Sequence, residues 1–328
     1  MLRRKFHAMK PVIAITGGTG FLGRHVIQHF LDQGATLKIL VRKPEHVDWD
    51  LPPEQVEELE VIKGSLTDKE ALAQLVDGAN VVVHMAGLIK ARRPIDFETS
   101  NVGGTRNLID VLKAQNPDSG FVFVSSMAAR EPTFSPYAAT KAAAEKVVQE
   151  LIDQPIILRP CAIYGPGDEE TLPLFKATRL PFQPALNGKE ARVCLVHVTD
   201  VADAIGRSAM ALIQKSSLQG TFEVSDERHE GYLWREIIEA ACLTCEQKAR
   251  PFHVPRLITK TLGRLGDLQA AITRSAVMLT SYKAVEVLHE DWSSNESVQL
   301  PQEVWQPSIT LPEGFENTVQ WYRNRKKL

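Results

Sequence analysis

The chain has 328 residues, of which 44% are hydrophobic, so it can bury the core of one large α/β domain or of a large and a smaller domain. Its formal net charge of −2 argues against a protein that acts mainly by binding nucleic acid, because such proteins carry a basic excess. No apolar run approaches the roughly 18 residues of a membrane-spanning helix, so no membrane span is expected.

The N-terminus and the cysteines bear on the location of the protein. Residues 1–10 are basic and lack the apolar run of a signal peptide, which indicates a solvated tail. Without an export signal, the four cysteines are predicted to be reduced thiols in a cytoplasmic protein. Cys242 and Cys245 form a lone CxxC, and the absence of a second ligand pair favours buried helix thiols over a redox or metal site. No metal is expected.

Short β-rich runs alternate with segments of helical periodicity through about residue 160. The predicted strands are 12–16, 36–42, 56–64, 80–87, 120–126 and 155–160, and the predicted helices are 23–34, 67–78, 100–115 and 135–151. This alternation predicts right-handed βαβ crossovers and a Rossmann-type, doubly wound parallel sheet of the α/β class.

The regular alternation of strands and helices ends after Gly165. Residues 164–189 are rich in turn-forming residues and are predicted to lie over the carboxyl edge of the sheet, where ligands bind in open α/β folds. Residues 256–272 have an amphipathic pattern, interpreted as a packed helix, with a membrane-surface helix as the alternative. We therefore predict a nucleotide-binding domain at 1–164 and a mainly substrate-binding lobe at 165–328, in which 193–213 packs back on the first domain.

A glycine-rich turn stands between the first strand and the first helix. Gly17, Gly20 and Gly23 allow a tight turn and let a pyrophosphate approach backbone N–H groups at the helix N-terminus. The strand before and the helix after make a dinucleotide site the favoured interpretation over a purely structural turn.

The segment "TGGTGFLG" resembles the fingerprint of the short-chain dehydrogenase/reductase superfamily, in its extended or atypical branch, the NAD-dependent epimerase/dehydratase family. The resemblance continues in "NVGGTRNL", "SPYAATKAAAE", "RPCAIYGPGD" and "RVCLVHVTDVADAI". It implies a Rossmann-type domain with a smaller C-terminal lobe, a small-molecule substrate and a homodimer.

The end of the second strand selects the cofactor. It carries no acid that would bind a ribose 2′-hydroxyl, but Arg42 and Lys43 suit a 2′-phosphate, so NADP(H) is favoured and NAD(H) stays open. By the resemblance, Ser65 and Leu66 flank the adenine, although family members often have an aspartate at the first of these positions. The resemblance implies further cofactor contacts from Phe21, Leu22, Met85, Ala86, Gly87, Tyr137, Lys141 and Pro160.

Tyr137 and Lys141 are one helical turn apart and share a face that points toward the end of the fifth strand. A nearby ammonium is expected to lower the tyrosine pKa from about 10 and make it an effective acid or base. The resemblance makes this pair, with Ser126, a catalytic Ser-Tyr-Lys constellation in which the serine orients a carbonyl; Ser125 is the fallback.

The residues expected to face substrate are Ser125, Arg130, Tyr164 and Arg192. Asn101, in the motif "NVGGTRNL", is a candidate for ordering the active site, with a purely structural helix position as the alternative.

Met127 and Ala128 follow the serine where nucleotide-sugar 4,6-dehydratases have an Asp-Glu pair, so dehydration chemistry is not expected. The leading prediction is an NADP(H)-dependent oxidoreductase of carbonyl or alcohol groups, similar to hydroxysteroid dehydrogenases and dihydroflavonol reductases. The alternatives are an NAD-dependent sugar-nucleotide 4-epimerase and a non-catalytic NADPH-binding structural or sensor protein.

Overall fold

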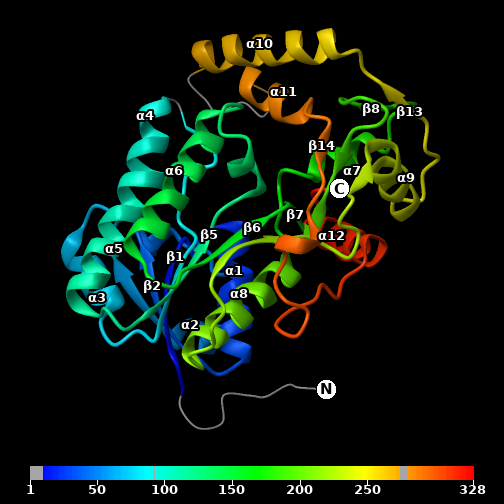
Figure 1. The fold of residues 1–328 in the computed structure, drawn as a ribbon. Helices are drawn as coiled ribbons and strands as arrows, with labels where there is room; N and C mark the ends of the chain where they lie inside the picture. Colours follow the sequence, from blue (N-terminus) through cyan, green and yellow to red (C-terminus); the bar gives the residue numbers. More distant parts are fainter. Residues whose placement is uncertain (1–9, 92, 274–279) are drawn as a thin grey trace.

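The computed structural model describes residues 10–91, 93–273 and 280–328 (Figure 1). The predicted basic tail therefore lies outside the described residues, except for Lys10. A 7-stranded parallel sheet in the order β11-β6-β5-β4-β1-β2-β3 forms the centre of the molecule and confirms the predicted fold class. Its strands are β1 (Val12–Thr16), β2 (Thr36–Val41), β3 (Leu59–Lys63), β4 (Val81–His84), β5 (Gly120–Val124), β6 (Ile156–Pro160) and β11 (Gly220–Val224).

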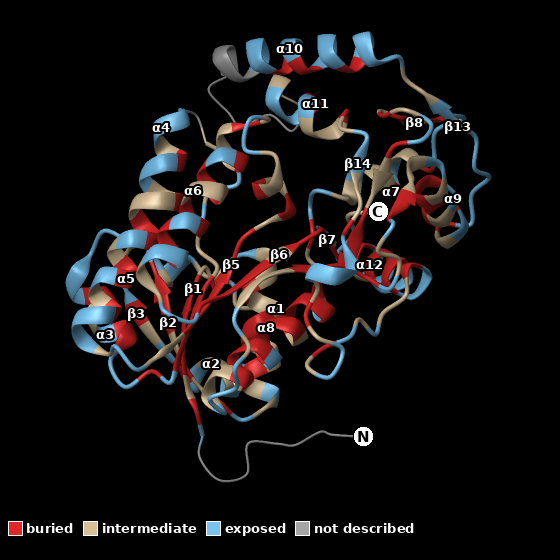
Figure 2. Cartoon of the chain, viewed as in Figure 1, coloured by how far each residue is buried: buried red, intermediate tan, exposed pale blue. Residues whose placement is uncertain are grey.

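Helices cover both faces of the sheet, which explains why the central strands β1, β4 and β5 are mostly apolar. Ile13 and Ile15 of β1 belong to a core shared with α1 and α8, while Ala14 between them belongs to a second core shared with α3, α5 and α6. Figure 2 shows these strands as buried. The covering helices are α1 (Phe21–Asp32), α3 (Lys69–Val76), α5 (Gly104–Gln115), α6 (Pro136–Leu151) and α8 (Val198–Ile213).

The sheet is larger than the sequence analysis predicted. β11 pairs in parallel with β6 and adds a strand from beyond residue 164 that we did not predict. α8 packs against α1, and an added Cβ at Gly206 would meet the His29 ring at 2.2 Å. The seventh strand of the sheet and one of its covering helices therefore come from the second half of the chain.

The rest of the second half forms a smaller lobe around a separate apolar core. Phe175, Phe315 and Tyr322 pack there, and two short sheets have the orders β12-β9-β14 and β13-β8. Its elements are α7 (Leu172–Ala177), β8 (Gln183–Ala185), β9 (Arg192–Val193), β12 (Tyr232–Leu233), α9 (Trp234–Thr244), β13 (Pro251–His253), α10 (Arg256–Thr273), α11 (Ser281–Val287), β14 (Asp291–Trp292) and α12 (Leu311–Asn324). The remaining short elements are η1 (Pro44–His46), α2 (Pro53–Glu57), α4 (Pro94–Phe97), η2 (Glu98–Gly103), η3 (Met127–Arg130), β7 (Ala162–Tyr164), β10 (Leu195–His197) and η4 (Glu296–Val298).

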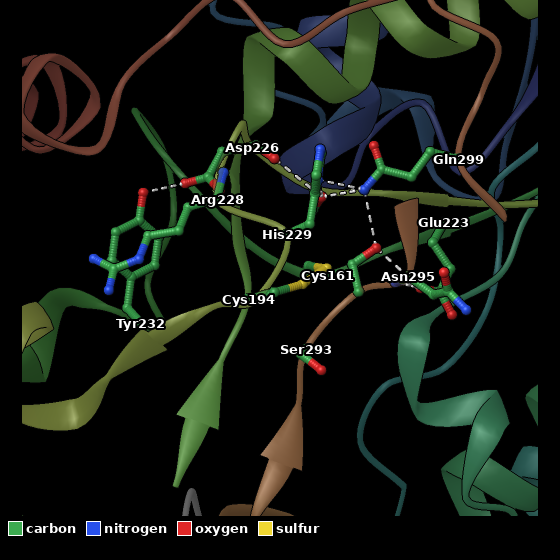
Figure 3. The surroundings of a disulfide bond; sticks show 12 residues. Cys161, Cys194, Glu223, Asp226, Arg228, His229, Tyr232, Ser293, Asn295 and Gln299 are labelled. Carbon is green, nitrogen blue, oxygen red and sulfur yellow. Dashed lines mark hydrogen bonds between the residues drawn. A yellow bond between two sulfur atoms is a disulfide. The ribbon is translucent and has the colours of Figure 1, made fainter. Parts of the chain in front are cut away.

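The prediction of four reduced thiols is wrong for two of the cysteines. Cys161, directly after β6, and Cys194, between β9 and β10, are joined in a disulfide with a Cα–Cα distance of 5.6 Å (Figure 3). The sequence could not reveal this pair, because β7 and β10 pair in parallel and bring together residues that are 33 apart. Cys242 and Cys245 are buried free thiols at the end of α9, as expected. None of the helices in the described part of the chain has the length and apolar character needed to cross a bilayer.

Candidate active site

The glycine turn requires glycine at two of its three predicted positions. Gly17 has φ +80°, and a Cβ there would lie 2.7 Å from the Ala86 nitrogen. A Cβ at Gly23 would lie only 2.2 Å from the Gly17 carbonyl oxygen. A Cβ at Gly20 would lie 3.4 Å from its nearest atom, the Gly17 carbonyl oxygen. Protein packing therefore does not require glycine at this position.

The start of α1 fits a phosphate group. Gly20 is the N-cap residue and offers no side chain to the first backbone N–H groups, and the first turn, which begins with Phe21 and Leu22, holds no acid. Uncapped N–H groups at a helix N-terminus bind anions well because the helix dipole adds to their hydrogen bonds. The predicted loop residues are therefore together and able to hold a pyrophosphate.

The predicted adenosine-side residues stand at the same carboxyl edge of the sheet. Arg42 and Lys43 directly follow β2 and are exposed, and neither side chain has an ion pair or hydrogen bond within the described part of the chain. Ser65 follows β3, with its hydroxyl 2.9 Å from the Thr67 hydroxyl, and a Cβ at Gly104 would meet the Leu66 side chain at 2.6 Å. Two uncommitted cations here are compatible with a phosphorylated ribose.

The segment after β4 lies between the glycine turn and Lys141. The Met85 nitrogen donates to the Thr16 carbonyl oxygen at 3.1 Å, and the Ala86 nitrogen donates to the Thr16 hydroxyl at 3.2 Å. An added Cβ at Gly87 would lie 3.2 Å from Asn101 Oδ1 and 3.7 Å from Lys141 Nζ. The predicted cofactor wall therefore leads directly to the predicted catalytic helix.

Ser126, Tyr137 and Lys141 are brought together by β5 and α6. Ser126 caps η3, and its hydroxyl accepts from the Ala128 nitrogen at 3.2 Å. Tyr137 lies in the first turn of α6, close enough to Ser126 for this serine to influence its ionisation. Lys141 is one turn further along, and its Nζ donates to the Val124 carbonyl oxygen at 2.8 Å.

The expected lowering of the tyrosine pKa is wrong for this structure. Burial raises the pKa of Tyr137 above its usual value; the nearby Ser126 opposes that shift, and the charge of Glu286 adds to it. Burial lowers the pKa of Lys141 to about 8, although the charge of Glu145 acts to raise it. We attribute the difference from the sequence prediction to desolvation, which penalises the charged form of both groups.

Asn101 orders this region from a π-helical turn, η2. Its Oδ1 accepts from the Leu88 nitrogen at 2.7 Å, and its Nδ2 donates to the Leu88 carbonyl at 3.1 Å and to the Thr140 hydroxyl at 3.1 Å. Isolated π-helical turns are often found at functional sites because they redirect a side chain. Asn101 thereby holds the segment after β4 against α6, beside Lys141.

A buried chain of hydrogen bonds through His84 was missed by the sequence analysis. His84 Nδ1 lies 2.6 Å from the Thr16 hydroxyl, and His84 Nε2 lies 2.9 Å from the Thr105 hydroxyl, which donates to the Asn101 carbonyl at 2.6 Å. Burial, and then the charge of Lys141, lower the pKa of His84 to about 3. The sequence offered one signal for this chain of hydrogen bonds: the adjacent strands "VIAIT" and "VVVH" both end in a polar residue.

Several predicted substrate residues make hydrogen bonds within the protein. The Ser125 hydroxyl donates to Glu145 Oε1 at 2.5 Å, and Glu145 accepts two hydrogen bonds from Arg159. Arg130 Nη1 donates to the Ser293 carbonyl at 2.6 Å and lies 3.5 Å from Glu223 Oε1. Figure 3 shows Glu223 next to Asn295, among the residues that surround the disulfide.

Tyr164 and Arg192 also belong to the small lobe. Tyr164 is fully buried, with its ring 5.2 Å from that of Phe315, and burial raises its pKa. Arg192 Nη1 donates to the Gly231 carbonyl at 3.1 Å. Pro160 is buried at the end of β6.

Comparison with known proteins agrees with this arrangement. A sequence model of the NAD dependent epimerase/dehydratase family matches residues 13–217. The chain is 40% identical over 318 residues to a ceramide reductase of Caulobacter vibrioides, covering 96% of this chain and 95% of that protein. It is 30% identical over 186 residues to the sterol-4-alpha-carboxylate 3-dehydrogenase, decarboxylating, of Saccharomyces cerevisiae, covering 49% of this chain and 53% of that protein.

Solved structures share the fold at low identity. The enzyme WbmG of Bordetella bronchiseptica, solved in complex with NAD, superposes with a TM-score of 0.70 at 19% identity and covers 97% of this chain and 96% of that one. At that identity the likeness supports the fold alone. The family match over residues 13–217 and the shared fold show that the chain is a member of the NAD dependent epimerase/dehydratase family and has the nucleotide-binding fold of its enzymes.

Proposed function

We propose that the protein is an NADP(H)-dependent oxidoreductase that interconverts a carbonyl and an alcohol, with Ser126, Tyr137 and Lys141 as its catalytic residues. The observation that carries the proposal is that β5 and α6 bring Ser126 close enough to Tyr137 to influence its ionisation, with Lys141 one helical turn away. A serine and a tyrosine hydroxyl that lie near each other can both reach one substrate oxygen.

Each residue has a distinct role in the reduction direction. Ser126 donates a hydrogen bond to the carbonyl oxygen and orients it. Tyr137 gives its proton to that oxygen as the alkoxide charge develops, and the Lys141 ammonium stabilises the resulting phenolate. When bound, the nicotinamide supplies or accepts the hydride. Asn101 and Thr140 hold α6 in the position that these contacts require.

The preference for NADP(H) rests on Arg42 and Lys43. Their exposed side chains follow β2 and have no acidic neighbour in an ion pair within the described residues. We expect Arg42→Asp to lower the ratio of NADPH to NADH affinity by about tenfold or more, because it replaces a phosphate ligand with a repelling charge. An unchanged ratio in nucleotide titrations would contradict this assignment.

For the substrate we propose a lipid of the ceramide class that carries a ketone. The similarity to a ceramide reductase supports it, since it covers nearly the whole length of both chains. Met127 and Ala128, where a dehydratase needs acidic groups, speak against dehydration of a sugar nucleotide. A sugar-nucleotide 4-epimerase stays the alternative because it needs the same three residues, but it would keep tightly bound NAD through purification.

The deciding experiment has two parts. Mass spectrometry identifies any nucleotide released by the fresh protein, and NADPH consumption is then measured with a ketone-bearing ceramide. Tyr137→Phe should lower turnover by about 10²- to 10⁴-fold while nucleotide affinity is kept. Tightly bound NAD would favour the epimerase. Nucleotide binding without turnover on a broad panel of carbonyls and alcohols would favour a non-catalytic role.

A further inference from the structure

Helix α10 presents an unusually apolar surface. Five large aliphatic side chains of the helix are 42% to 75% exposed: Leu257, Ile258, Leu262, Leu265 and Leu268. At about 100° per residue they occupy one arc of the helix, about 140° wide. Figure 1 shows α10 along the outer edge of the molecule, beyond α11.

The inner side of α10 is made of small residues. Thr259, Gly263 and Gly266 are buried. An added Cβ at Gly263 would lie 2.9 Å from both Ala284 Cβ and the Thr280 carbonyl oxygen, so the two helices approach closely there. Figure 2 shows the buried residues of α10 on the side of α11. The large aliphatic side chains are therefore not the contact between α10 and the rest of the protein.

The charges of α10 are unevenly arranged. The acid Asp267 accepts from the Ser281 nitrogen at 3.1 Å and so faces α11. Arg256 pairs with Glu290 at 2.6 Å. Lys260 and Arg264 have no ion pair within the described part of the chain, and their positions border the apolar arc. A broad apolar arc next to uncompensated cations is the pattern of a helix that lies in a bilayer interface.

We propose that α10 docks the protein on a membrane surface that contains anionic lipids. The leucine arc would enter the boundary between headgroups and acyl chains, and Lys260 and Arg264 would contact the anionic headgroups. The packed-helix interpretation of residues 256–272 accounts for only the small-residue side of α10. The exposed arc and the placement of the charges support the alternative that the sequence had left open.

Contacts connect this surface to the catalytic helix. Glu286 of α11 accepts from the Ser135 hydroxyl at 2.6 Å, and Ser135 is the N-cap of α6. The Trp292 indole donates to the Glu286 carbonyl at 2.8 Å, and its ring lies 6.1 Å from that of Phe134. A docked α10 would therefore hold the start of α6, with Tyr137, close to the source of a lipid substrate. Membrane docking is a property beyond the proposed function, because the protein can bind a membrane without catalysing a reaction.

The test is co-sedimentation of the full chain with vesicles of phosphatidylglycerol and phosphatidylcholine, and with vesicles of phosphatidylcholine alone. We expect binding to the anionic vesicles that salt weakens. Leu265→Gln with Leu268→Gln should lower partitioning about tenfold or more. Lys260→Ala with Arg264→Ala should lower it about fivefold for each charge removed. The matched controls Leu243→Gln and Lys69→Ala, at exposed positions of α9 and α3, should bind normally.

The outcomes separate docking from the other proposals. Failure of the unaltered protein to bind anionic vesicles overturns docking. A stable dimer that the leucine substitutions dissociate, without vesicle binding, also overturns it and makes α10 an interface between copies of this chain. The inactive Tyr137→Phe protein should still bind vesicles, so loss of the proposed activity and loss of docking are read separately.

Discussion

At the scale of single residues, the ionisation of Lys141 is expected to control activity. Burial brings its pKa down from 10.5 to about 8, so it loses its charge within a range that is easily measured. We expect kcat/KM for carbonyl reduction to fall as the pH rises through about 8, since this parameter reports the free enzyme and the neutral amine no longer stabilises the phenolate. A profile that stays flat to pH 10 would contradict this role.

His84 gives a second prediction at this scale, on stability. The native state keeps the imidazole neutral down to about pH 3, whereas the unfolded chain protonates it near its usual pKa of 6.5. The unfolded state therefore binds more protons between those values, and the free energy of unfolding falls as the pH falls, by up to about 1.4 kcal/mol per pH unit for one site.

The measurement is denaturant unfolding at several pH values between 6.5 and 4. His84→Gln should lower the slope of the unfolding free energy against pH by the equivalent of about one proton. His46→Gln, at an exposed position, should leave that slope unchanged. Equal slopes for the two variants would show that His84 is not the titrating group. His25, His29 and His197, whose pKa values burial also lowers, would add to the remaining slope, and Asp226, whose pKa burial raises to about 6, would oppose it.

The candidate catalytic residues could be proposed from the sequence, but their surroundings could not. Tyr137 and Lys141 follow from helical spacing, and Ser126 from its position after a strand. Ser125, the residue beside it, donates its hydroxyl hydrogen bond to Glu145. The pKa directions were missed because they depend on burial, which comes from segments far away in the sequence.

At the scale of elements, two glycines of the glycine turn are expected to have different roles: Gly23 is needed for close packing and Gly20 for nucleotide binding. Gly23→Ala would place a methyl group against the backbone of Gly17 and Gly18, at 2.2 and 2.6 Å. We expect it to lower the free energy of unfolding by about 1–3 kcal/mol and to abolish nucleotide binding. Gly20→Ala meets nothing closer than 3.4 Å and should change stability by less than about 0.5 kcal/mol while weakening nucleotide binding.

Denaturant unfolding and nucleotide titration of both variants test this difference. The negative φ of Gly20, −77°, allows alanine there without strain, so its effect should appear only when nucleotide is present. If both alanine variants lost the same stability, the distinction between the two glycines would be wrong.

A buried ion pair joins α6 to β6. The Glu145 side chain is only 4% exposed and pairs with Arg159 at 2.5 Å. Arg159→Ala leaves that carboxylate buried without its cation, so we expect a loss of about 3 kcal/mol in the free energy of unfolding. Arg207→Ala, which removes an exposed pair with Asp203, should cost less than about 1 kcal/mol. Replacing Glu145 and Arg159 together by Met should restore most of the loss.

Elements of the first half followed from the sequence because each strand is a short apolar run bounded by turn residues. Asp68 caps α3 by accepting from the Ala71 nitrogen. β11 was missed because it belongs to the sheet only through pairing with β6, and nothing local distinguishes it from a strand of the small lobe.

At the scale of the whole molecule, the disulfide between Cys161 and Cys194 connects the segment after β6 to the segment between β9 and β10. Cys161→Ala with Cys194→Ala should lower the free energy of unfolding by about 2–4 kcal/mol. Thiol titration of the denatured, unreduced protein should detect Cys242 and Cys245 only. Four reactive thiols would show that the bond does not form, whereas its presence removes the cysteine argument for a cytoplasmic location.

The position of β11 in the sheet also has a consequence for the order in which the protein can assemble. During synthesis β6 is complete at Pro160, but its outer edge stays unpaired until Val224 has emerged. Nascent chains shorter than this expose an apolar strand edge, which other chains can pair with and aggregate. Chaperone binding during translation should therefore concentrate on chains between these two lengths, and a fragment ending at 164 should be insoluble.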